Sequence, residues 1–153
     1  MSNLEDLYKE IILDHYRTPR NRGELESPAT KTEGFNPLCG DEITIYLLVE
    51  DGLIKDIKLT GQGCSISQAS SSLMSAAVNG KTVEQARATI ETFKELMTNH
   101  ESTLEHDGEP AKVDLRSLGE LAALQGVVKF PVRIKCAMLA WTTFAQGLEE
   151  ATA

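Results

Sequence analysis

The sequence predicts an α+β protein in which a small three-stranded antiparallel sheet packs against several helices. Apolar residues alternate between Glu42 and Glu50, a hairpin dipeptide follows them directly, and helical periodicity occurs on both sides of this region. A strand pattern followed by helical patterns is typical of this fold class. A chain of 153 residues can bury a core without disulfides, so we expect a single domain over residues 1–153.

The first half of the chain is expected to form one helix and the sheet. Ser2 and Glu5 form a capping box ahead of apolar residues at helical spacing. The dipeptide Asp51-Gly52 is a strong signal for a two-residue hairpin turn. The predicted elements are a helix ending near Arg17, strands over Glu42–Glu50 and Leu53–Thr60, and an edge strand over 30–36.

The second half is expected to be helical. Thr82 and Gln85 form another capping box, and Trp141 and Phe144 fall at core spacing near the C-terminus. The predicted elements are a helix over Ser65–Val78, a helix running from the capping box to about Met97, a polar loop over Asn99–Asp114, a short helix over Leu115–Leu124 and a last helix over about Arg133–Glu149.

Composition and charge exclude two classes of partner. The net charge of -8 argues against nucleic acid, because binding to phosphates requires a cationic surface. The most apolar region, between Leu121 and Trp141, is interrupted by Pro131 and by the charged residues Lys129, Arg133 and Lys135, so it is not expected to span a membrane. Met1 leads directly into a polar run, so we expect no secretory signal and a cytoplasmic protein.

The three cysteines lie in settings that favour metal binding or thiol chemistry over disulfides. Their number is odd, and a cytosolic environment keeps thiols reduced. Cys39 lies in a turn between Pro37 and Gly40, Cys64 precedes a helix, and Cys136 is expected in the first turn of the last helix. Unpaired amides at a helix N-terminus stabilise a thiolate. The alternative is that these cysteines are simply core residues, because cysteine is among the most buried residue types.

Asp41, two residues after Cys39, adds a carboxylate to this set. Three thiolates and one carboxylate are a complete tetrahedral set for zinc, although the sequence has no C-x-x-C pair and spacing alone selects no metal. An oxygen ligand among sulfurs indicates a site that can exchange ligands. The three histidines, His15, His100 and His106, are expected at the surface and outside any metal site.

Three longer motifs resemble the U-type iron–sulfur assembly proteins. They are NPLCGDEI around Cys39, GQGCSISQASSS around Cys64 and FPVRIKCAMLAW around Cys136, and the similarity spans nearly the whole chain. IscU-type scaffolds in this family carry a histidine immediately before the third cysteine, where this sequence has Lys135. An extra segment also precedes that cysteine. Both differences resemble the SufU branch of zinc-dependent sulfurtransferases.

The resemblance implies a site and a partner. Cys39, Asp41, Cys64 and Cys136 match the family's zinc ligands, and Arg133 matches an arginine near the site. Cys39 would accept persulfide sulfur from a SufS-type cysteine desulfurase, whose histidine would replace Cys39 on the zinc. The sulfur would then pass to downstream Suf-type cluster assembly proteins. Two alternatives remain open: a scaffold that assembles a [2Fe–2S] cluster on the same four ligands, and a noncatalytic zinc-stabilised interaction domain.

Overall fold

The computed structural model describes residues 3–26, 28–37, 40–105, 120–121, 123–124, 127 and 131–152. The described elements are α1 (Asn3–Arg17), β1 (Thr30–Asn36), β2 (Asp41–Glu50), β3 (Leu53–Gln62), α2 (Ser65–Val78), α3 (Val83–Glu105) and α5 (Pro131–Thr152). They form a three-stranded sheet with helices packed against it, which confirms the predicted α+β fold class. The single domain over residues 1–153 remains a prediction.

The sheet is antiparallel in the order β1-β2-β3, and the predicted edge strand over 30–36 is β1. Asp51 and Gly52 both have positive φ, 55° and 73°, which is the geometry of a two-residue hairpin turn that fits the twist of the strands. Asn36, the last residue of β1, pairs with Asp41, the first residue of β2. The stretch 37–40, which contains Cys39, therefore connects two paired strand ends.

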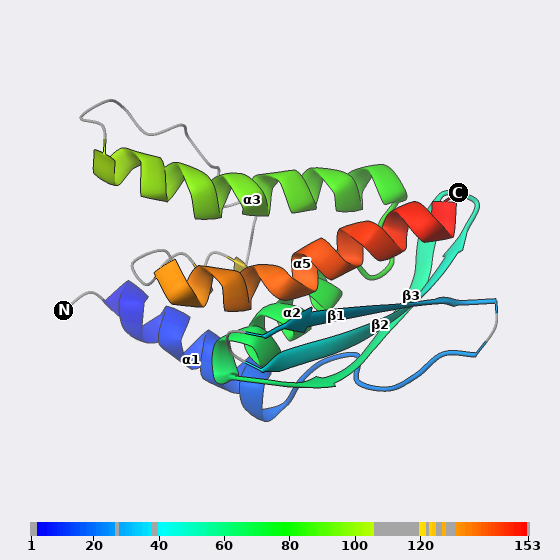
Figure 1. Ribbon diagram of the computed structural model, residues 1–153, viewed down its shortest axis with the longest axis horizontal. Coiled ribbons are helices and arrows are strands. Elements are labelled where there is room, and N and C mark those ends of the chain that lie inside the picture. The colour runs from blue at the N-terminus through cyan, green and yellow to red at the C-terminus, as the bar shows by residue number, and fades with distance from the viewer. Residues whose placement is uncertain are drawn as a thin grey trace.

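Helix α5 lies between the sheet and α3, and contacts both β1 and β2 (Figure 1). Helix α2 packs against α1, α5 and β3, so its N-terminus is held near the end of the sheet. In the described part of the chain, no helix is both long and apolar enough to cross a membrane.

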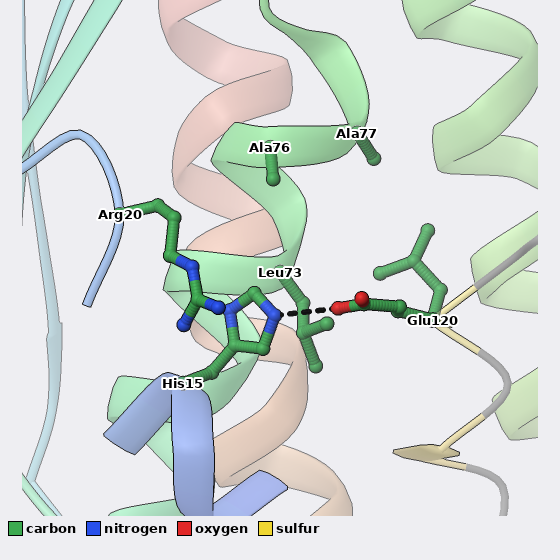
Figure 2. Close-up of a pocket in the computed structure, with 7 residues that line it drawn as sticks. His15, Arg20, Leu73, Ala76, Ala77 and Glu120 are labelled. Atoms are coloured by element: carbon green, nitrogen blue, oxygen red, sulfur yellow. Dashed lines mark hydrogen bonds and ion pairs between the residues drawn. The ribbon is translucent and has the colours of Figure 1, made fainter. Parts of the chain in front are cut away.

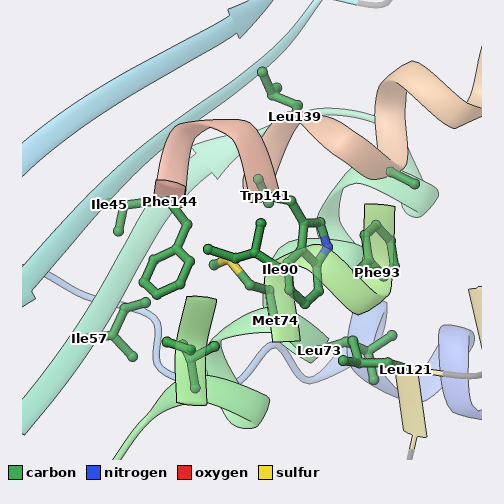
Figure 3. Close-up of a cluster of buried hydrophobic side chains, with 14 of the residues drawn as sticks. Ile45, Ile57, Leu73, Met74, Ile90, Phe93, Leu121, Leu139, Trp141 and Phe144 are labelled. Carbon is green, nitrogen blue, oxygen red and sulfur yellow. The ribbon is translucent and has the colours of Figure 1, made fainter. Parts of the chain in front are cut away.

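The core lies where α2, α3 and α5 meet the inner face of the sheet (Figure 3). Trp141 and Phe144 of α5 are fully buried, as predicted, and Trp141 stacks on Phe93 of α3 with ring centroids 4.2 Å apart. The Trp141 indole N–H donates to Ser70 Oγ at 3.1 Å, and that hydroxyl donates to the carbonyl oxygen of Ala137 at 2.6 Å. The indole is therefore both packed and hydrogen-bonded.

The helix boundaries differ from those predicted in three places. Helix α3 continues to Glu105, so the first part of the predicted loop over Asn99–Asp114 is helical; its residues 99–105 include no glycine or proline to end the helix. Helix α5 begins at Pro131, because proline suits the first turn of a helix. The described residues of the predicted helix over Leu115–Leu124 have 3₁₀ geometry, while Ser2 and residues 106–119 lie outside the described ranges.

Candidate metal centre

Three elements bring Asp41, Cys64 and Cys136 together at one end of the sheet. Asp41 opens β2, Cys64 is the N-cap of α2, and Cys136 lies on α5. Their carboxylate oxygen and sulfur atoms all lie within 4.8 Å of one another. Asp41 and Cys136 are fully buried, and Cys64 is half-buried. Three of the four predicted ligands thus converge; Cys39 lies outside the described residues.

Asp41 and Cys64 are joined by direct hydrogen bonds. The backbone N–H of Cys64 donates to Asp41 Oδ1 at 2.9 Å, and the Cys64 thiol lies 3.9 Å from Asp41 Oδ2. The Cys64 sulfur in turn accepts a hydrogen bond from the backbone N–H of Ser67 at 3.4 Å, which is the capping interaction of α2. The sulfur therefore lies at the N-terminal end of α2, close to its unpaired backbone amides.

Cys136 lies deeper in its helix than predicted. Because α5 begins at Pro131, Cys136 is its sixth residue and belongs to the second turn, so the prediction that it lies in the first turn is wrong. The dipole effect falls off within the first turn and gives little help to this thiol. Its charge environment comes instead from Arg133, which hydrogen-bonds Cys136 and lies beside Cys64.

Arg133 is exposed to solvent yet interacts with both sulfurs. Its pKa is raised above the ordinary arginine value, first by the hydrogen bond to Cys136 and then by charge interaction with Cys64 and Cys136. The guanidinium thus places a positive charge beside both sulfur atoms. Arg133 therefore lies at the site, where the sequence comparison placed it, whereas Lys135 is exposed on the same turn.

The donor set fits zinc. Two sulfurs and a buried carboxylate oxygen match its preferred ligands, and sulfurs bound at about 2.3 Å in a tetrahedral site lie about 3.8 Å apart. The observed limit of 4.8 Å is about 1 Å wider, so small side-chain movements would suffice to close the site. A fourth ligand is needed to complete the tetrahedron, and Cys39 is only two residues before Asp41 in the chain.

His15 forms a second polar centre, and the prediction that it lies at the surface is wrong. Only 2% of its surface is exposed. Its Nδ1 lies 2.7 Å from Ser72 Oγ. Its Nε2 lies 2.7 Å from a Glu120 carboxylate oxygen, as Figure 2 shows. Its position four residues after Ile11, on the apolar side of α1, was the signal that could have revealed its burial.

A pocket of about 300 Å³ opens beside this histidine. Arg20 and Glu120 are its charged lining residues, and the remaining walls are apolar residues of α2 together with Leu121 (Figure 2). This pocket is separate from the cysteine cluster, because none of its lining residues belongs to that cluster. The His100 side chain and all of His106 lie outside the described residues.

Comparisons with known proteins give the family. Residues 7–147 match the NifU-like N terminal domain. The chain is 40% identical over 147 residues to the zinc-dependent sulfurtransferase SufU of Bacillus subtilis (strain 168), covering 96% of this chain and 92% of that protein. It is 38% identical over 149 residues to the iron–sulfur cluster assembly scaffold protein IscU of Streptococcus pyogenes serotype M1, covering 97% and 87%.

The fold of a solved relative agrees. A crystal structure from Fervidobacterium islandicum AW-1, described as a candidate iron–sulfur cluster assembly scaffold protein for the SUF system, superposes with a TM-score of 0.81 at 31% identity. The superposition covers 94% of this chain and 98% of the other. The three converging candidate ligands, the family match and the shared fold lead to one conclusion: the chain belongs to the NifU-like N-terminal domain family, to which its resemblance to SufU and IscU pointed.

Proposed function

We propose that the protein is a zinc-dependent sulfurtransferase that accepts persulfide sulfur from a SufS-type cysteine desulfurase and relays it to iron–sulfur cluster assembly. The observation that carries this proposal is the convergence of Asp41, Cys64 and Cys136 within 4.8 Å. The similarity to the Bacillus subtilis sulfurtransferase supports it. We place the reaction in the cytoplasm, where thiols stay reduced.

Chain connectivity supports the assignment of Cys39 as the fourth ligand and the acceptor. Two trans peptide units span at most about 7.6 Å between Cα atoms, so the position of Asp41 limits how far Cys39 can lie from the cluster. Cys39, Asp41, Cys64 and Cys136 would together hold Zn²⁺, which, when bound, favours the deprotonated form of its thiol ligands. Cys64 fixes Asp41 through its backbone N–H, and both residues are anchored on regular elements.

The transfer step is a thiol–persulfide exchange at Cys39. Its thiolate attacks the outer sulfur of the persulfide on the desulfurase cysteine, and a new S–S bond forms on Cys39. The donor S–S bond breaks, and the desulfurase cysteine leaves as a thiolate, so no external oxidant or reductant is required. Arg133 places a positive charge beside the Cys64 and Cys136 sulfurs, where it stabilises anionic sulfur. The same exchange would then pass the sulfur to the next acceptor in cluster assembly.

A scaffold that assembles a [2Fe–2S] cluster is the second candidate. The similarity to the Streptococcus pyogenes scaffold protein favours it, because the same four residues could hold iron. Lys135 argues against it, since a lysine ammonium has no lone pair to donate to a metal, whereas the histidine of IscU-type scaffolds does. We therefore rank the sulfurtransferase first.

The test is the activity of a SufS-type cysteine desulfurase with and without the zinc-loaded protein. We expect strong stimulation, loss of that stimulation with Cys39→Ala, and a mass increase of one sulfur atom on Cys39 in the wild type. A Leu7→Ala variant, which removes an exposed apolar side chain from α1, is the matched control. A Cys39→Ala variant that relays sulfur normally would contradict the assignment.

Two further outcomes separate the alternatives. No stimulation with zinc confirmed in place, together with a stable visible absorbance band after anaerobic cluster reconstitution, would favour the scaffold. Biological activity that survives alkylation of the thiols would favour a noncatalytic zinc-stabilised domain.

A further inference from the structure

We propose that Gly63 is a positioning residue for Asp41, because its missing side chain provides the space that the Asp41 carboxylate occupies. A Cβ atom at position 63 would lie 2.4 Å from Asp41 Oδ1, 3.0 Å from its Cγ and 3.1 Å from its Cβ. All three of the nearest atoms belong to that one side chain. The steric part of this inference depends on the geometry alone, and its consequence for metal binding rests on the proposed function.

The requirement at Gly63 is for space and not for an unusual backbone conformation. Its φ lies outside the left-handed region, so alanine could adopt the same backbone. Gly61, two residues earlier, differs on both counts. It has φ of +145°, and a Cβ there would lie 2.2 Å from the backbone carbonyl oxygen of Glu42. The two glycines of the G-Q-G motif therefore serve different purposes.

The displacement that alanine would cause at Gly63 can be worked out from these distances. A methyl carbon and an oxygen in ordinary contact lie about 3.5 Å apart, so the Asp41 carboxylate would have to retreat by about 1 Å from its 2.4 Å separation. Metal–ligand distances tolerate only about 0.2 Å. Asp41 is fully buried and hydrogen-bonded to the Cys64 N–H, so the movement would also break that contact.

Gly63 thus keeps an oxygen donor beside two sulfurs. With alanine in its place, the cluster would retain its thiols and lose its carboxylate. Because the displaced group is itself a proposed ligand, we expect Gly63→Ala to weaken zinc binding by about 10- to 100-fold, the range seen when groups that orient metal ligands are removed.

The experiment is a double-mutant cycle on the full chain, comparing Gly63→Ala, Asp41→Ala and the double variant. Zinc affinity is measured by competition with a chromophoric chelator, and the Co²⁺ absorption spectrum reports the donor set. We expect each single variant to weaken zinc binding and the two to share one Co²⁺ spectrum. Gly63→Ala should weaken zinc binding by a much smaller factor in the Asp41→Ala background, because the carboxylate that the new methyl group displaces is already gone and only the 3.1 Å contact with the residue 41 Cβ remains.

Gly61→Ala is the matched control. Its Cβ meets backbone and not the Asp41 side chain, so its effect should be the same factor with and without Asp41. If Gly63→Ala lowers zinc affinity by the same factor in the wild type and in the Asp41→Ala variant, it acts through the backbone and the proposal is overturned. Zinc affinity unchanged by Gly63→Ala, or by Asp41→Ala, would overturn it as well.

Thermal unfolding of the metal-free variants keeps the test decisive if Gly63→Ala folds poorly. Asp41→Ala should then restore stability to the Gly63→Ala chain, and a double variant as unstable as Gly63→Ala would refute the steric coupling. None of these measurements uses a desulfurase. If the double-mutant cycle gives the expected result but sulfur transfer fails, that failure would therefore count against the proposed function only.

Discussion

Replacing His15 with alanine should destabilise the protein far more than replacing its hydrogen-bond partner Glu120. The two side chains share one contact at 2.7 Å, but they differ in environment: 2% of the His15 side chain is exposed, against 61% for Glu120. Loss of the buried partner leaves a cavity and removes one hydrogen bond of the Ser72 hydroxyl, whose oxygen still accepts from the Arg20 backbone N–H at 2.8 Å. Loss of the exposed partner leaves an imidazole nitrogen next to a pocket that water can enter.

The magnitude follows from burial. Removing the buried hydrogen bond between His15 and Ser72 costs about 1 kcal/mol, and the cavity left by the ring adds about 2 kcal/mol, for a total of about 3 kcal/mol. Glu120→Ala should cost at most about 1 kcal/mol, because exposed ion pairs contribute little. For a domain of this size these values correspond to about 6–12 °C and at most about 4 °C in melting temperature.

The assay is urea unfolding followed by the fluorescence of Trp141, the single tryptophan, with all variants in the same metal state. Trp141 lies in the core, so its fluorescence changes when the core unfolds. His15→Gln, which keeps one donor and one acceptor, should recover part of the loss. The reasoning is refuted if Glu120→Ala costs as much as His15→Ala, or if His15→Ala costs less than about 1 kcal/mol.

Three further predictions concern other parts of the molecule. Chelation should lower the melting temperature, because a ligand at 1,000 times its Kd contributes about 4 kcal/mol; an unchanged transition after verified zinc removal would contradict this. A hydrogen bond from Arg20 lowers the pKa of Asp14, so ionised Asp14 stabilises the folded state above the pKa that it has in the unfolded chain. This stabilisation is lost as the pH falls through the lowered pKa of the folded state. Arg20→Ala should raise the Asp14 pKa in an NMR titration. Thr82→Ala should cost about 1 kcal/mol in urea unfolding, because Thr82 Oγ1 accepts from the Gln85 N–H at 3.1 Å, and no loss would refute the capping box.

Features with local causes could be predicted from the sequence. The Asp51-Gly52 turn needs only two residues with positive φ, and the capping box needs only the reciprocal bonds between Thr82 and Gln85. The edge strand expected over 30–36 is β1. The fold class then followed from the order of the elements.

Features with tertiary causes could not be predicted in this way. The burial of His15 depends on Ser72 and Glu120, which are 57 and 105 residues away in the chain. No spacing rule places Cys136 beside Cys64, because their contact requires α5 to cross the sheet next to the start of α2. The grouping of the candidate ligands was expected from chemistry and family resemblance, whereas the different surroundings of Gly61 and Gly63 appear only in the folded structure.

The placement of the ligands indicates how metal binding and sulfur transfer can be combined. Asp41 is held by strand pairing with Asn36, Cys64 by its capping bond to Ser67, and Cys136 by the interior of α5, so three positions are fixed by backbone hydrogen bonds of the fold itself. Zinc would bridge β2, α2 and α5 and stabilise their packing, while the elements retain their own hydrogen bonds without it. Cys39 lies between β1 and β2 in the chain, outside the described residues. Under the proposed function, Asp41, Cys64 and Cys136 would keep hold of the metal while Cys39 accepts sulfur from a partner's persulfide.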